Sequence, residues 1–188
     1  DDSLGGDANN DGDQTTPAAG NWSGLSINNG GSLVATHTNI RYADTAVSTS
    51  SYNARVVDIS NATISDSYSD GIRVLVDRSG ANAGTATVRI QNSTVQDSGG
   101  IGIDFNRSAS GLSRLTLTDV DVNGAGNEGI ALDIAGSNTV DITIRQGSEV
   151  SNIVGSSAVA LNTTGGAKTV NVLFDGSTFD NDSTAAAV

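Results

Sequence analysis

The fold is decided by three neighbouring runs: Gly71-Ile-Arg-Val-Leu-Val76, Val88-Arg-Ile-Gln-Asn-Ser-Thr-Val95 and Gly102-Ile-Asp-Phe105. Similar runs recur along the chain, and apolar residues alternate with polar ones in each, which is the period of a β-strand. Each recurring unit opens on a small residue. These openings are Gly24, Ala46, Gly71, Gly102, Gly129, Ala158 and Ala187, 22 to 31 residues apart. The sequence is therefore a repeat, and the repeat has to be found before local structure is assigned.

One unit of three short strands cannot bury its apolar face alone, but stacked units bury a continuous column. Helices are disfavoured, because the runs are rich in Val, Ile, Thr, Asn and Ser and show no 3.6-residue period. The spacing predicts an all-β, right-handed parallel β-helix of about six coils, with three short strands per coil. Extra residues are expected in turns such as 78–84. A β-sandwich is the alternative.

Composition limits the function more than it reveals it. Ser, Thr and Asn supply 24, 19 and 18 of the 188 residues, and the net charge is −12. An acidic chain with nine cationic side chains is a poor partner for nucleic acid, and no apolar run is long enough for membrane insertion. The absence of Cys excludes disulfides and thiolate metal sites, and His37, the only His, cannot form a two-histidine zinc site.

The Gly-Ile openings followed by Ile-x-Asn-Ser-Thr-Val-x-Asp-Ser resemble the repeats of right-handed parallel β-helix proteins, the pectate-lyase-like superfamily. The run Gly20-Asn-Trp-Ser-Gly-Leu-Ser-Ile27, with Thr38-Asn-Ile-Arg-Tyr-Ala43, is similar to the first coil of large bacterial secreted and surface proteins of this type. The resemblance covers about residues 20–188. It implies the fold but not one function, because this scaffold carries lyases, hydrolases, epimerases, adhesins and ice-binding surfaces.

A candidate calcium loop precedes the repeats. Asp7, Asn9 and Asp11 take positions 1, 3 and 5 of an EF-hand-type loop, Gly12 takes position 6, Asp13 offers its carbonyl and Thr15 takes position 9. The usual Glu at position 12 is replaced by Ala18, so we expect a weaker site or a ligand from Asp1 or Asp2. A structural calcium ion is the predicted cofactor. A disordered acidic linker is the alternative.

The sequence divides into residues 1–19, which carry this loop, and a β-helix over 20–188 that we expect to continue in a longer parent protein. Trp22 is expected to pack on the open end of the first coil, with a sugar-stacking platform as the alternative. The acidic composition, the single lysine and the absence of Cys are typical of secreted bacterial proteins. We therefore expect an extracellular or bacterial cell-surface location.

The outward row of the first strands is the candidate ligand face. If Ile72 and Val74 point inward, Arg73 points outward. In the following coils the predicted face adds Asp104, Asn106, Arg107 and Asp133. Arg73 and Asp104 are expected to be stacked neighbours forming a cross-strand ion pair.

The sequence favours a non-catalytic module, because the face offers Arg73 without a cluster of acids, and Lys168, the only lysine, lies in a turn. Such a module would serve as a calcium-stabilised rigid spacer or as an adhesive surface for polysaccharide or cell-surface glycan, next to adjoining domains. No catalytic residue is assigned. The alternative is a polysaccharide-active enzyme or a uronide-binding module of the pectate-lyase-like kind, with Asp104 and Asp133 as the paired carboxylates.

Overall fold

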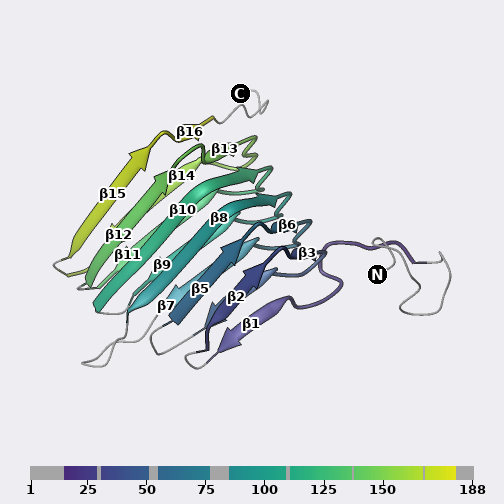
Figure 1. The fold of residues 1–188 in the computed structure, drawn as a ribbon, viewed down its shortest axis with the longest axis horizontal. Coiled ribbons are helices and arrows are strands. Elements are labelled where there is room, and N and C mark those ends of the chain that lie inside the picture. Colours follow the sequence, from purple (N-terminus) through teal and green to yellow (C-terminus); the bar gives the residue numbers. More distant parts are fainter. Residues whose placement is uncertain are drawn as a thin grey trace.

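The structure, a computed structural model, describes residues 15–28, 31–50, 55–76, 85–108, 111–136, 138–166 and 168–180. These residues form an all-β parallel solenoid of about five turns (Figure 1), close to the six coils expected. The described part of the chain contains no helix, and therefore none that could span a membrane. The predicted calcium loop before Thr15 and the predicted turn insertion at 78–84 lie outside the described residues.

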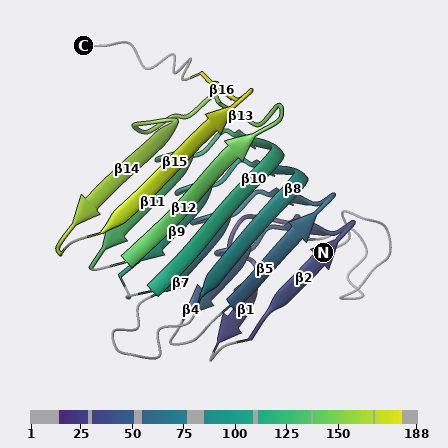
Figure 2. The same cartoon turned by 60° about the vertical axis from the view of Figure 1, so that its left-hand side comes forward.

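Each coil contributes one strand to a first sheet and one to a second. The first sheet is formed by β1 (Leu25–Asn28), β4 (Val47–Ser50), β7 (Ile72–Val76), β9 (Ile103–Arg107), β11 (Ile130–Ala135) and β14 (Val159–Thr164), stacked in that order. The second sheet, in front in Figure 2, is formed by β2 (Leu33–Thr36), β5 (Arg55–Ser60), β8 (Ala86–Gln96), β10 (Gly111–Asn123), β12 (Asn138–Arg145) and β15 (Thr169–Asp175). All these pairings are parallel.

The third position of each coil is a short strand. Four of these strands are separate: β3 (Asn39–Arg41), β6 (Thr63–Ser65), β13 (Glu149–Ser151) and β16 (Thr178–Phe179). In the middle coils β8 and β10 continue through a bend into the same position, where Val95 pairs with Ile64 on one side and with Val122 on the other. The three strands per coil predicted from the sequence are confirmed.

The core is a set of apolar columns that run along the solenoid. In the first sheet Ile72, Ile103 and Ile130 stack in register, each with 0% exposure. Val88, Leu115 and Ile142 form a matching column in the second sheet. Because like residues stack on like, each coil buries the apolar face of its neighbour, and this repeated burial is what stabilises the fold.

The opening glycines are required by the close approach of successive coils. A Cβ added at Gly102 would lie 2.6 Å from the carbonyl oxygen of Gly129 and 2.5 Å from Val122 Cγ1. Gly71 and Gly129 meet the same kind of obstruction. At these three glycines, successive coils lie too close together to leave room for a side chain.

The two bends that flank the third strand each use one left-handed residue per coil. The first bend stacks a column of residues with φ between 47° and 63°: His37, Asn61, Asn92, Asp119, Gln146 and Gly176. The second bend stacks a column with φ between 52° and 70°: Tyr42, Asp66, Asp97, Gly124 and Asn152. Asn, Asp and Gly tolerate this conformation best, which explains why they dominate both columns. Tyr42 is one of these bend residues and is only partly buried.

Candidate functional site

The outward row of the first sheet is arranged as the sequence predicts. Arg73 pairs in register with Asp104, which pairs with Ala131, and Leu75 pairs with Asn106, which pairs with Asp133. Alternation along β7 buries Ile72 and Val74 and leaves Arg73 exposed.

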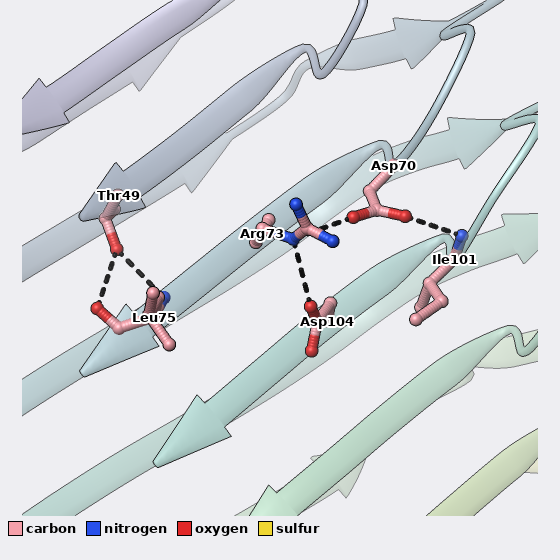
Figure 3. Close-up of polar contacts among 6 residues, drawn as sticks. All are labelled: Thr49, Asp70, Arg73, Leu75, Ile101 and Asp104. Atoms are coloured by element: carbon pink, nitrogen blue, oxygen red, sulfur yellow. Dashed lines mark hydrogen bonds and ion pairs between the residues drawn. The ribbon is translucent and has the colours of Figure 1, made fainter. Parts of the chain in front are cut away.

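Arg73 lies between two buried carboxylates (Figure 3). Its Nε is 3.0 Å from Asp70 Oδ2 and donates a hydrogen bond of 3.2 Å to Asp104 Oδ2. The Asp70 side chain is 4% exposed and the Asp104 side chain 9%, whereas that of Arg73 is 48% exposed. The predicted ion pair between Arg73 and Asp104 is confirmed, and Asp70 is an additional member that the sequence reasoning missed.

Asp70 is held by the loop before β7. Its Oδ1 accepts a hydrogen bond of 2.9 Å from the backbone N–H of Ile101, in the next coil (Figure 3). A Cβ at Gly100 would be 2.6 Å from that oxygen, so the glycine leaves room for the carboxylate. The Gly99-Gly100 pair is the signal in the sequence that could have indicated this contact. Two consecutive glycines beside a turn of the repeat indicate that another group packs closely against the backbone there.

Burial also changes the acidity of Asp104. Desolvation raises its carboxyl pKa above the ordinary 3.8; the hydrogen bond from Arg73 opposes this, and the negative charges of Asp70 and Asp133 add to the rise. The buried Oδ1 of Asp104 has no hydrogen-bond partner among the described residues. The site therefore holds an acid that protonates more readily than an exposed aspartate.

Arg107 does not belong to the outward face, and that expectation is corrected. It follows Asn106 in β9, so alternation points it inward, in register with Val76 and Ile134. The residue is 0% exposed, and burial lowers the pKa of its guanidinium. Asn106 and Asp133 do lie on the outward row, and Asp133 accepts a hydrogen bond of 2.9 Å from Asn162.

A groove along the third strand position of the coils was not predicted from the sequence. It has a volume of about 390 Å³ and is lined by Thr94, Gln96, Asp97, Asp121, Asn123, Glu149 and Ser151. Asp121 and Glu149 are register partners, so two like charges stack one coil apart. Desolvation, then the charges of Glu149 and Asp119, raise the pKa of Asp121 above 3.8. Aligning Val122 with Val150 in the sequence would have placed both acids in one row.

A hollow near the N-terminal end brings two exposed aromatic rings together. Trp22, Asp44 and Tyr68 line it, with residues 19–21 and Ser23, and its volume is about 510 Å³. Trp22 begins the first coil through a parallel bridge to Ala43, and it is 42% exposed, not buried over the coil end as expected.

The described residues contain no group of three or more His, Cys, Asp or Glu side chains arranged to hold a metal ion. Of the predicted calcium ligands, only Thr15 is described, and it is exposed. Asp7, Asn9, Asp11 and Asp13 lie outside the described residues, so the calcium loop stays a prediction.

Comparison with protein-family models, curated proteins and solved structures gives no match. The parallel β-solenoid is shown by the structure itself, whereas the pectate-lyase-like resemblance and a bacterial origin rest on the sequence motifs alone.

Proposed function

We propose that this chain is a non-catalytic, rigid β-solenoid spacer of a secreted or cell-surface bacterial protein. The observation that carries the proposal is the unbroken register from coil to coil. One outward row of the second sheet runs through six strands as Val34, Asp58, Arg89, Thr116, Thr143 and Leu173, with a parallel pairing at every step. A stack with this continuity resists bending, because tilting one coil breaks hydrogen bonds at all three strand positions.

The arrangement around Arg73 supports a structural use of the acidic face. Asp70 and Asp104 both contact one guanidinium nitrogen, so a single positive charge partly compensates the two carboxylates within the fold. Removing Arg73 would leave two buried carboxylates close together, a costly arrangement. The cluster therefore joins the loop before β7 to β9.

The spacer proposal is tested by the distance between its ends. The chain has no Cys, so Val34→Cys and Leu173→Cys, both at exposed positions, accept spin labels specifically. Five steps of about 4.8 Å place the two backbones about 24 Å apart. We expect a single narrow distance distribution by pulsed electron paramagnetic resonance. The matched control is Val34→Cys with Thr116→Cys, three steps apart, which should give a proportionally shorter distance. A broad distribution for the end pair would overturn the proposal.

One observation favours the second candidate, a polysaccharide-active enzyme. Asp104 has a raised pKa and lies near a second carboxylate, a combination that general acid catalysis uses. Incubation with polygalacturonate and with neutral polysaccharides, followed by assay of new reducing ends and unsaturated uronide, separates the two functions. The spacer predicts no turnover. Turnover that is lost in Asp104→Asn would replace the spacer with the enzyme.

A further inference from the structure

The N-terminal hollow joins features from three successive coils. Trp22 lies before β1, Asp44 in the loop between β3 and β4, and Tyr68 in the loop between β6 and β7. Tyr68 is 70% exposed and Trp22 42%, so both rings face solvent across a volume of about 510 Å³. Exposed aromatic rings that gather in a hollow are uncommon on a soluble protein and typically mark a binding site.

Hydrogen bonds hold the backbone of these residues and the Trp22 ring in place without a ligand. The Trp22 indole N–H donates a hydrogen bond of 2.7 Å to the carbonyl of Arg41, and the Asp44 N–H donates one of 2.7 Å to the carbonyl of Trp22. The Tyr68 N–H donates one of 2.9 Å to the carbonyl of Ala43. The hollow is therefore preformed, which reduces the entropy lost on binding.

The chemistry of the lining fits a neutral sugar. Two aromatic rings offer apolar faces to the C–H groups of a pyranose, and Asp44, Asn21 and Ser23 offer acceptors and donors to its hydroxyl groups. Among the residues that the structure describes, no cationic side chain lines the hollow. Asp44 is acidic, and the chain carries a net charge of −12. A uronide or a nucleic acid would be repelled by these charges.

We propose that the hollow between Trp22 and Tyr68 binds a neutral hexose unit of a glycan. The site lies on the loops before β1, β4 and β7 and shares no lining residue with the cluster of Asp70, Arg73 and Asp104. It does not depend on whether the solenoid acts as a spacer. It would attach the module to a glycan surface by one end.

Trp22 is the only tryptophan of the chain, so its fluorescence reports directly on the hollow. The probes are the neutral hexasaccharides of β-1,4-glucan, β-1,4-mannan and α-1,4-glucan, each titrated into the 188-residue chain, with hexagalacturonate as the acidic comparison. We expect a saturable change with at least one neutral sugar and a Kd of about 1 mM or tighter. Hexagalacturonate should leave the fluorescence unchanged at the same concentrations.

Two variants assign the binding to this hollow. Tyr68→Ala should weaken binding about tenfold or more, because truncating an aromatic anchor removes most of its contact. Val154→Ala changes an equally exposed apolar side chain outside the hollow (65% exposed) and should bind like the parent chain. Circular dichroism spectra of both variants should match that of the parent. The proposal is overturned if no neutral probe changes the fluorescence, if hexagalacturonate binds as well, or if folded Tyr68→Ala binds as tightly as the parent.

Discussion

At the scale of the residue, His37 departs from the amide residues that follow it in its column. It holds φ at 53° in a position that Asn61 and Asn92 occupy in the next two coils, where their amide groups hydrogen-bond each other at 3.5 Å. An amide at this position can extend the hydrogen bonding between coils, whereas the His37 ring hydrogen-bonds the neighbouring Thr36 hydroxyl, at 3.0 Å. The left-handed region costs an ordinary residue about 1–2 kcal/mol.

We therefore predict that His37→Asn stabilises the protein by up to about 1 kcal/mol, measured as a higher midpoint of urea unfolding. The reverse change, Asn61→His, should destabilise it by a similar amount. A lower stability of His37→Asn would show that the imidazole ring contributes more to the free energy of unfolding than the backbone preference of Asn does.

The raised pKa of Asp104 predicts how stability depends on pH. An acid whose pKa is higher in the folded state than in the unfolded state favours folding when protonated, and this contribution is lost as pH rises from about 3.8 through the folded pKa. Asp104→Asn imitates the protonated form. We expect its Tm to exceed that of the parent at pH 7, and the difference to vanish below pH 3.8, as followed by thermal melts across this range.

The matched control is Arg73→Gln, which leaves Asp70 and Asp104 buried without the guanidinium. The Arg73→Gln substitution should destabilise the protein more at pH 7 than in acid, because the two carboxylates carry their charges at pH 7. A Tm difference for Asp104→Asn that is independent of pH would contradict ionisation of Asp104 as the cause.

At the scale of the element, the sequence predicts the strands well because their period of two and their order are repeated in every unit. It also places Arg73 against Asp104, since both follow an opening Gly-Ile. The sequence analysis places Arg107 on the outward face with its neighbours Asp104 and Asn106, yet alternation along the strand points it inward like Phe105. The hollow beside Trp22 could not be predicted, because loops of different length bring Asp44 and Tyr68 together only after the coils stack.

The glycine that opens β9 gives a prediction at this scale. Gly102→Ala places a methyl group 2.6 Å from a backbone oxygen of the next coil, so one of the two coils must shift. We expect a loss of about 1–3 kcal/mol, and hence a lower Tm. Gly176→Asn is the matched control. A Cβ at Gly176 would lie 4.0 Å from the nearest atom, and Asn tolerates the φ of 63° at this position. Equal effects of the two changes would contradict close coil stacking as the reason for Gly102.

At the scale of the whole molecule, burial declines toward the last coil. Leu161, Phe174 and Phe179 are 45%, 49% and 37% exposed, although their register partners Leu132, Ile144 and Val150 are at most 1% exposed. In a stack each coil is stabilised only by its neighbours. Local unfolding should therefore begin at the coil of β14 and β15, which has a described neighbour on one side only. We predict that amide hydrogens of β14 and β15 exchange at least about tenfold faster than those of β9 and β10. Uniform protection, measured by hydrogen exchange, would indicate one cooperative unit.

The last prediction concerns calcium and the residues before the first coil. A site formed by Asp7, Asn9, Asp11 and Asp13 only in the folded protein would add RT ln(1 + [L]/Kd) to stability, about 2.7 kcal/mol at one hundred times Kd. We therefore expect calcium to raise the Tm above its value with chelator, and Asp11→Ala to remove the difference. A shift that survives this substitution would place the ion elsewhere, for which the acidic groove containing Asp121 and Glu149 is then the first region to mutate. Equal melting with calcium and chelator would leave the segment as an acidic linker, and a spacer built from this solenoid would then depend on coil stacking alone.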